Sequence, residues 1–273
     1  MIRSLALATD LMVRSDVSEL VSKGHYTILR TPQEPDFWFG NAILLHLPPK
    51  SETADDLIAL SRAAFPNAAH VCLQWDVPDM SLPQEIVADL TLQGFDVDVS
   101  DTLVLNEPLA RPALPDGLRV AALATENDWA QSLALGMEIA VEDGYDPVLH
   151  RPYLAQSVEG QRRRIRDGRG AWFGVFAGDL LVAQMGVFHD GKLFRYQQVE
   201  TRATHRRGGI CAALLGHAGA WAMGRAPDAK VVIVADADGP AGRIYRRAGF
   251  ALVEKLTSAV NGAYAPGFSA AVT

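Results

Sequence analysis

A short basic segment with glycines, residues 206–211 (Arg-Arg-Gly-Gly-Ile-Cys), has the composition of an anion-binding turn. The preceding residues 194–201 predict a strand, and the following residues, rich in Ala and Leu through Trp221 and Met223, predict a helix. The first turn of a helix exposes backbone N–H groups, its dipole favours negative charge, and glycines let phosphate oxygens approach closely. The sequence therefore predicts a phosphate site at this strand-to-helix turn.

A second segment, residues 238–250, predicts a short helix that follows a buried strand. Residues 231–234 (Val-Val-Ile-Val) are all β-branched, which favours a strand covered on both faces. Asp238 can cap the helix that follows, Pro240 suits its first turn, and Gly249 can end it in the left-handed conformation.

The apolar and aromatic side chains of this short helix are expected on different sides. Tyr245 comes one residue after the apolar Ile244, and neighbouring positions on a helix do not face each other. We therefore expect Ile244 to make the core contact and Tyr245 to project elsewhere.

The two segments together resemble the motifs of the GNAT acyltransferase superfamily in order, spacing and intervening strand. The first is similar to the acyl-CoA pyrophosphate loop, R/Q-x-x-G-x-G/A, and the second to the N-x-x-A-x-x-L-Y-x-x-x-G-F element. Two positions depart from the pattern, since Cys211 replaces Gly or Ala and Asp238 replaces Asn. Cys is small and keeps its backbone N–H, whereas Asp238 adds a negative charge near a polyanionic ligand. The matching positions are Arg206, Gly209 and Cys211, then Asp238, Ala241, Ile244, Tyr245, Gly249 and Phe250.

This resemblance implies transfer of an acetyl group from acetyl-CoA, as cosubstrate, to an amine within a ternary complex. It implies that the backbone amide of Val199 polarises the thioester carbonyl and that Tyr245 protonates or orients the departing sulfur. Glu200 is the candidate base, because it is the only acidic residue between Lys192 and Asp228.

Further binding residues follow from the same resemblance. Two acids and an aromatic side chain between the predicted helices lie where acceptors of this superfamily commonly enter, and they could hold an ammonium group. An ordinary acidic loop is the alternative. The residues assigned to acyl-CoA are Val199, Arg206, Arg207, Gly208, Gly209, Ile210, Cys211, Asp238 and Ala241, and those assigned to the acceptor are Glu142, Asp143 and Tyr145.

Each catalytic assignment competes with a structural one. Tyr245 could be a packed aromatic with its hydroxyl at the surface. Glu200 could belong to a surface ion pair with Arg202 or Arg206, and such pairs contribute little to stability. Cys211 is more simply explained as a small packing residue than as a nucleophile. No metal is expected, because the histidines lack metal-ligand spacing with each other or with the cysteines.

The elements that must position these residues follow a proline-rich stretch. Residues 108–117 predict a linker between a first domain, 1–107, and a catalytic domain, 118–273. The resemblance implies an α+β chain with the GNAT fold, a mixed, mostly antiparallel sheet flanked by helices. The elements expected are a strand from 118, helices near 128–141 and 152–167, strands at 171–176, 180–189 and 193–201, and then helix, strand, helix and strand.

The first half repeats part of this pattern in a weaker form. Its Gly94 and Phe95 echo Gly249 and Phe250, and the same offset sets Leu90 opposite Tyr245 and residues 49–51 opposite the basic loop. We therefore predict two GNAT-like domains in tandem, of which the first has lost the cofactor loop. The elements expected there are strands at 42–46 and 71–75 and helices at 54–65 and 83–92.

Composition bounds the remaining possibilities. A net charge of −7 argues against a nucleic-acid partner and favours cationic acceptors such as amines. Only Cys72 and Cys211 are present, which indicates a cytoplasmic protein without a disulfide framework. The apolar residues 5–8 are too few for a signal core or a membrane span. A small-molecule amine, a protein amine, a longer acyl donor and a non-catalytic acyl-CoA-binding regulatory module all remain open, as does the oligomeric state.

Overall fold

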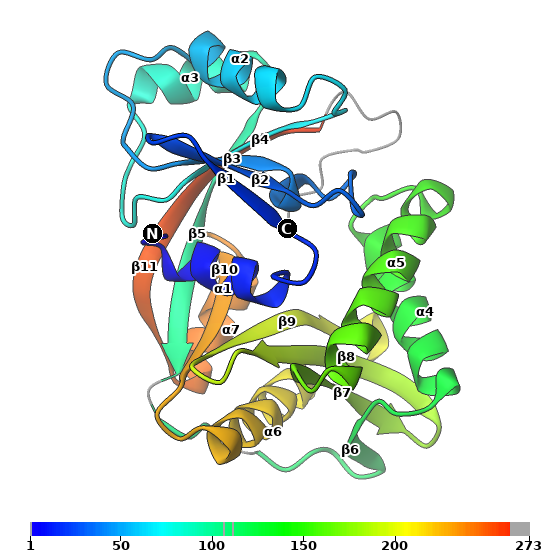
Figure 1. Cartoon of the computed structure of the whole chain (residues 1–273). Helices are drawn as coiled ribbons and strands as arrows, with labels where there is room; N and C mark the ends of the chain where they lie inside the picture. The colour runs from blue at the N-terminus through cyan, green and yellow to red at the C-terminus, as the bar shows by residue number, and fades with distance from the viewer. Residues whose placement is uncertain (1, 106, 111, 263–273) are drawn as a thin grey trace. The chain divides into compact units, whose positions relative to one another are not determined.

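The computed structural model describes residues 2–105, 107–110 and 112–262, which form two compact units (Figure 1). The first unit takes the described residues up to Thr102, Ala235–Gly239 and those from Val253 onward, and the second takes Leu103–Val234 and Pro240–Leu252. The division into domains 1–107 and 118–273 stays a prediction. Within the linker 108–117, the described residues form neither helix nor strand, and Arg111, like Asn106, lies outside them.

The elements confirm the predicted order in the second half of the chain. From β6 to β11 they run strand, helix, helix, three strands, helix, strand, helix and strand. Before β6 they are α1 (Leu5–Val13), β1 (Glu19–Ser22), β2 (Tyr26–Arg30), η1 (Trp38–Gly40), β3 (Ala42–Leu45), α2 (Ala54–Ala64), β4 (Val71–Trp75), α3 (Gln84–Leu92) and β5 (Asp96–Leu105). After it come β6 (Leu118–Ala122), α4 (Glu126–Glu142), α5 (Pro147–Arg166), β7 (Gly170–Ala177), β8 (Leu180–His189), β9 (Leu193–Thr201), η2 (Ala203–His205), α6 (Ile210–Arg225), β10 (Lys230–Asp236), α7 (Pro240–Ala248) and β11 (Phe250–Asn261).

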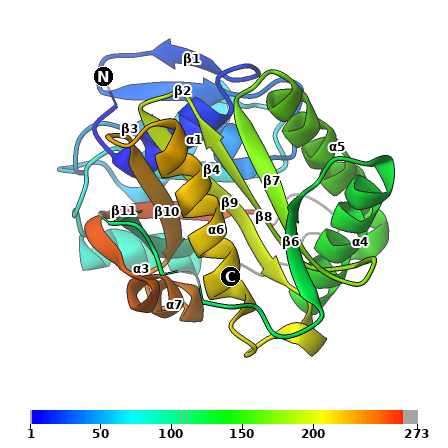
Figure 2. The same ribbon diagram turned by 90° about the horizontal axis from the view of Figure 1, so that it is seen from below.

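The sheet of the second unit is covered by helices on both faces. Its strands lie in the order β10-β9-β8-β7-β6, with β10 parallel to β9 and the other pairs antiparallel. Trp172 of β7 packs against Trp129 of α4, and the next residue, Phe173, packs against Trp221 of α6. Because successive strand residues point to opposite faces, α4 and α6 cover opposite faces of this sheet (Figure 2).

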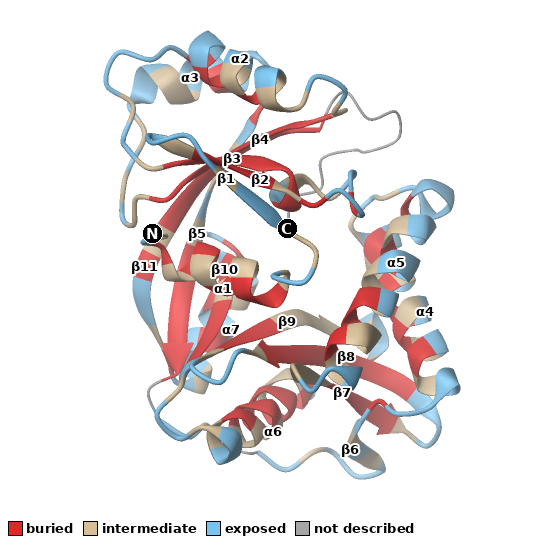
Figure 3. Cartoon of the chain, in the orientation of Figure 1, coloured by how far each residue is buried: buried red, intermediate tan, exposed pale blue. Residues whose placement is uncertain are grey.

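In the first unit the strands lie in the order β1-β2-β3-β4, followed by the last residues of β11. Strands β3 and β4 are buried along their whole length (Figure 3). Leu90 of α3 is fully buried, Gly94 has a φ of 79°, and Phe95 is buried. Gly249 has a φ of 114° before the buried Phe250, so the helix-glycine-phenylalanine-strand pattern occurs in both halves, as predicted.

Helix α5 begins earlier than the sequence interpretation placed it. Asp146 caps the helix, because its Oδ1 accepts hydrogen bonds from the N–H groups of Val148 and Leu149 at 2.8 and 3.0 Å. Pro147 then takes the first helical position, where a missing N–H costs nothing. Pro152, which we took as the start, lies inside the helix.

The beginning of the chain forms a helix that is fixed within the first unit. Ser4 caps α1, and its hydroxyl donates a hydrogen bond to the buried Glu254 at 2.8 Å. The carboxylate of Glu254 also accepts a hydrogen bond from the N–H of Ala6 at 2.9 Å. Nowhere in the described residues is a helix both long and apolar enough to span a membrane.

Candidate active site

A β-bulge in β9 decides where Glu200 lies. The register of β8 with β9 passes from Gly186 opposite Gln197 to Gln184 opposite Glu200, so three residues of β9 match two of β8. Gln198 has a φ of 44°, a left-handed conformation that non-glycine residues adopt rarely. In a regular strand the residue opposite Gln184 would be Val199. The inserted residue therefore gives this position to Glu200.

Strand β9 also separates from its other neighbour, β10. The parallel pairing joins residues 193–195 of β9 to residues 230–232 of β10, and both strands continue beyond the last pair. Residues 196–201 therefore lack a register partner in β10, and Gln198 and Val199 lack one in β8 as well. This leaves the backbone at Val199 available to a ligand.

A hydrogen-bond network centred on the buried Gln184 holds the carboxylate of the half-buried Glu200. The side-chain amide of Gln184 donates to Glu200 Oε2 at 2.6 Å and to the carbonyl of Ser132 at 3.2 Å. Gln184 Oε1 accepts from the Ser132 hydroxyl at 2.5 Å and from the Trp172 indole at 3.1 Å. All polar positions of the amide thus face suitable partners, which locks Gln184 with its N–H toward the carboxylate.

The environment of Glu200 raises its pKa to about 7. Burial is the main cause, and the nearby negative charge of Asp143 adds to it, while the hydrogen bond from Gln184 opposes both. The surface ion pair considered from the sequence does not form, because Arg202 pairs with Glu138 at 2.6 Å and Arg206 pairs with Glu142. A carboxyl that titrates near neutral pH suits proton transfer.

The predicted phosphate loop ends in an uncapped helix. Gly209 is the N-cap of α6, with a φ of 76° and no side chain to accept from the first N–H groups. Arg207, two residues earlier, is also left-handed, with a φ of 65°. Ile210 is buried, so it can contribute only its backbone N–H to a ligand. The geometry is that of a helix N-terminus open to an anion.

The acidic residues predicted for the acceptor have different surroundings. Glu142 forms an ion pair with Arg206, whose Nε donates to the carbonyl of Thr201 at 2.9 Å. Burial and the charge of Glu142 raise the pKa of Asp143. Tyr145 stacks on His150 with ring centroids 4.4 Å apart. Of these residues, Asp143 is the one whose charge acts on Glu200.

Tyr245 corrects the expectation for α7. Ile244 is 42% exposed and Tyr245 only 6%, so the tyrosine makes the core contact that we assigned to the isoleucine. Its ring lies 6.2 Å from that of Phe250, which also contacts Tyr196. Burial, with a contribution from nearby Cys211, raises the pKa of Tyr245, so its phenol is protonated at neutral pH.

The two remaining motif positions and the cysteine have different surroundings. Asp238 is exposed and belongs to the first unit, and its N–H donates to Asp236 Oδ1 at 3.1 Å. Ala241 is half-buried in α7. Burial raises the pKa of the Cys211 thiol to about 11, which disfavours the thiolate that a nucleophilic role would need.

The architecture has counterparts among solved structures, although no protein-family model and no curated protein matches the sequence. A GCN5-related N-acetyltransferase from Kribbella flavida aligns with a TM-score of 0.60 at 17% identity, over 98% of this chain and 96% of that chain. A tandem GNAT protein from the clavulanic acid biosynthesis pathway aligns with a TM-score of 0.55 at 14% identity, over 94% of each chain. The chain has the tandem GNAT fold. A functionally unknown conserved protein from Staphylococcus epidermidis ATCC 12228 shares it, with a TM-score of 0.73 at 14% identity over 91% of this chain and 97% of that chain.

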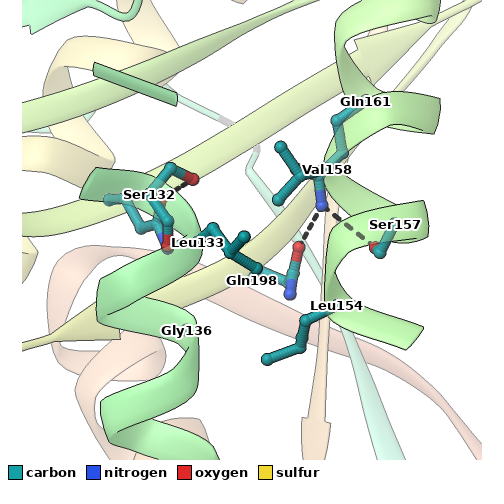
Figure 4. A pocket seen from close by; sticks show the side chains of 9 residues that line it. Ser132, Leu133, Gly136, Leu154, Ser157, Val158, Gln161 and Gln198 are labelled. Carbon is teal, nitrogen blue, oxygen red and sulfur yellow. Dashed lines mark hydrogen bonds between the residues drawn. The ribbon is translucent and has the colours of Figure 1, made fainter. Parts of the chain in front are cut away.

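Beside the β9 bulge, this GNAT fold encloses a small pocket whose cavity volume is about 10 Å³, room for about one water molecule. Figure 4 shows Ser157 and Gln161 of α5 facing Gln198 of the bulge, with Ser132 and Gly136 on α4. The side-chain amide of Gln161 donates to Gln198 Oε1 and to Ser157 Oγ. The pocket therefore has hydroxyl and amide groups on several sides.

Glycine at position 136 brings the pocket close to Glu200. A Cβ built there would lie 3.9 Å from Glu200 Oε2 and 3.8 Å from Leu154 Cδ1, at ordinary contact distance. The space beside Gly136 therefore borders the carboxylate that Gln184 holds.

Sequence reasoning missed Gln184, Ser132 and Gln161. They come from two helices and a strand far apart in the sequence, and amide and hydroxyl residues have no motif spacing of their own. One signal was available for Gln184: it is the single glutamine within the otherwise apolar residues 180–188 of β8.

Proposed function

We propose that this protein transfers an acetyl group from acetyl-CoA to an amine in a ternary complex, with Glu200 as the base. The observation that carries the proposal is a carboxyl with a pKa of about 7, held by Gln184 beside the unpaired segment of β9. An amine attacks only when neutral, so a base that is ionised near neutral pH is what this reaction requires.

The roles of the other residues follow from their surroundings. The backbone N–H of Val199 lies in the unpaired bulge, from which it can donate to a carbonyl oxygen that gains negative charge. Tyr245 keeps its proton because burial raises its pKa, so its hydroxyl can protonate a departing sulfur. Glu200 accepts the proton that the amine loses as the new C–N bond forms.

The N-terminus of α6 suits the pyrophosphate of an acyl-CoA. Its first N–H groups have no capping side chain, and the glycines at 208 and 209 leave room for phosphate oxygens, since a Cβ at either position would meet nothing closer than 3.8 Å. Backbone donors and the helix dipole favour an anion there. We assign acyl-CoA to this end of α6 and the acceptor to the side of β9 that faces α4 and α5.

The proposal includes one active site per chain, in the second unit, and no nucleic acid or metal. The partner is a small-molecule or protein amine. Both cysteines are free thiols, which is compatible with a reducing, cytoplasmic compartment.

The test is CoA release from acetyl-CoA, measured with a thiol reagent across a panel of amines. We expect Glu200→Gln and Tyr245→Phe each to lower kcat by about 100-fold or more, the range of general acid–base catalysis. If both variants release CoA as fast as the unmodified protein, the assignment is wrong. A protein that binds acyl-CoA without turnover would instead be a regulatory acyl-CoA-binding module.

A further inference from the structure

Two ion pairs join helix α4 to the segment that leads into the predicted phosphate loop. Glu138 and Glu142 are four residues apart on α4, and therefore lie on one face of the helix. Glu138 pairs with Arg202, and Glu142 pairs with Arg206. The two arginines are also four residues apart, on the stretch between β9 and α6. The acceptor side and the acyl-CoA side of the proposed site are thus connected by these two contacts.

The pair of Glu138 with Arg202 is a fixed contact. Arg202 Nη1 lies 2.6 Å from both oxygens of the Glu138 carboxylate, and Nη2 donates to the carbonyl of Leu181 at 3.3 Å. The side chain of Arg202 is only 19% exposed. A half-buried arginine with several acceptors would lose them all by moving, so we expect this pair to persist when a ligand binds.

The pair of Glu142 with Arg206 is more exposed to solvent. The side chains are 38% and 46% exposed, respectively. Exposed ion pairs are weak, because water and salt screen their charges. Arg206 Nε also donates to the carbonyl of Thr201 at 2.9 Å, so the guanidinium keeps one partner when its contact with Glu142 breaks. A stronger anion can therefore replace Glu142 without displacing the arginine from the loop.

Arg206 is the first residue of the predicted phosphate loop, three residues before the N-cap Gly209. The pyrophosphate of an acyl-CoA carries more negative charge and more acceptor oxygens than one carboxylate. Arginine binds phosphate through charge-assisted hydrogen bonds that are frequently bidentate. The same guanidinium can therefore pair with either of two anions, Glu142 of the chain or the pyrophosphate of the ligand.

We propose that Glu142 competes with the pyrophosphate of acyl-CoA for Arg206, so that binding of the acyl donor frees Glu142 on the acceptor side of the site. The phosphates then neutralise Arg206, whose charge otherwise offsets the charges of Glu142 and Asp143. The acceptor side becomes more negative as the acyl donor binds. This inference rests on the proposed function, because it takes Arg206 as a ligand of the acyl-CoA phosphates.

The test measures the dissociation constant of CoA by calorimetry at low salt, on the full-length protein. We expect Glu142→Gln to bind CoA about three- to fivefold more tightly than the unmodified protein, the most that an exposed ion pair can withhold from the ligand. The matched control, Glu138→Gln, removes the same charge from the same helix and should leave the affinity unchanged. Damage to the fold would weaken binding, so the direction of the change is diagnostic. Equal affinity of Glu142→Gln and the unmodified protein, or an equal gain in both variants, overturns the inference.

A double variant separates exchange at Arg206 from a general effect of charge. In Arg206→Gln the competition no longer exists, so adding Glu142→Gln should leave the affinity for CoA as it is in the single Arg206→Gln variant. A gain in affinity that persists in the double variant overturns the inference, because the carboxylate would then act on the ligand without Arg206.

Inorganic pyrophosphate distinguishes this inference from the proposed function, since it supplies the phosphates without the acyl-bearing arm. We expect Glu142→Gln to bind pyrophosphate more tightly as well, by a similar factor in an NMR titration. If pyrophosphate shows this gain and CoA does not bind, the exchange at Arg206 is supported and the proposed function is wrong. If CoA binds and neither ligand shows a gain, only the inference is wrong. If neither ligand binds, both are wrong.

Discussion

The N-termini of α2 and α6 differ in whether protein side chains accept hydrogen bonds from their backbone N–H groups. At α2, Thr53 and Asp56 form a reciprocal capping box, and Glu52 accepts the N–H groups of Lys50 and Ser51 at 2.7 and 3.1 Å. At α6, Gly209 offers no side-chain acceptor. The first end is closed by the protein's own carboxylates, and the second is open to an anion from outside.

The same contrast appears in the titration of the acidic groups. Hydrogen bonds from backbone N–H groups lower the pKa of Glu52 and Asp56, whereas burial raises the pKa of Glu200. Hydrogen bonds from backbone N–H groups favour the ionised form of a carboxylate, whereas an environment that disfavours charge lets a carboxylate exchange a proton near neutral pH. In our proposal, the carboxylates at the N-terminus of α2 occupy the place that an acyl-CoA phosphate takes at α6.

The strongest test of this contrast removes the exchangeable carboxylate. We expect Glu200→Gln to lower kcat/KM by about 100- to 10,000-fold. In the unmodified protein the ionised base is present above its pKa of about 7, so activity should rise through that pH and fall below it. A pH series from about pH 5.5 to about pH 8.5 measures this limb. Glu159→Gln, an exposed substitution on α5, is the control, and an unchanged limb in Glu200→Gln would refute the assignment.

A carboxylate added at the N-terminus of α6, like those at the N-terminus of α2, should abolish most acyl-CoA binding. Gly208 has no close neighbour, since a Cβ there would lie 3.8 Å from the nearest atom, so Gly208→Asp adds a carboxylate without a clash. We expect the dissociation constant of CoA, measured by calorimetry, to rise by about 100-fold, because the added charge competes with the phosphates for the N–H groups. Gly208→Asn separates charge from size and should cost much less. Equal binding by Gly208→Asp and the unmodified protein would show that the phosphates bind elsewhere.

The raised pKa of Glu200 should also make this carboxyl a cost to stability. Its folded pKa of about 7 exceeds the ordinary 4.5, so the stabilising protonated form is fully present below pH 4.5 and is lost as the pH rises through 7. Glu200→Gln should therefore raise the free energy of unfolding by roughly 1–3 kcal/mol at alkaline pH and by little in acid. Urea denaturation at both pH values checks this. A stabilisation of equal size at both would mean that ionisation is not its cause.

The smallest effect is expected when the N-cap side chain of α2 is removed. Thr53→Ala removes the cap, which should lower the free energy of unfolding by about 1 kcal/mol. CoA affinity should stay the same, because this helix end has no ligand in our proposal. Thr53→Ser keeps the hydroxyl and serves as the control. A change in CoA affinity without a loss of stability would mean that the two helix ends are not used differently.

Local signals in the sequence account for much of the second half. The β-branched run before residue 235, the strand-to-helix turn at the basic loop and the left-handed Gly249 each depend on nearby residues, and the order of elements followed from them. Local signals also failed where two were equivalent: Asp146 and Pro147 begin α5, although Pro152 offers the same cue.

The candidate site was predictable only in part. Glu200 was found because it is the one acid in its region, but its partner Gln184 depends on a register that the bulge alters. Tyr245 was found by motif and placed on the wrong side, because periodicity in a nine-residue helix with both an isoleucine and a tyrosine does not decide which one the core accepts. Such choices depend on tertiary packing.

The single extra residue in β9 makes two features of the site genetically separable. Deleting Gln198 would restore a regular count, and Glu200 would then stand opposite Gln184 by ordinary pairing. The carboxylate would keep its place, while the unpaired backbone at Val199 would be lost. The base therefore depends on which residue stands at position 200, and a substitution removes it. The carbonyl-polarising N–H depends on the number of residues in β9, and a deletion removes it.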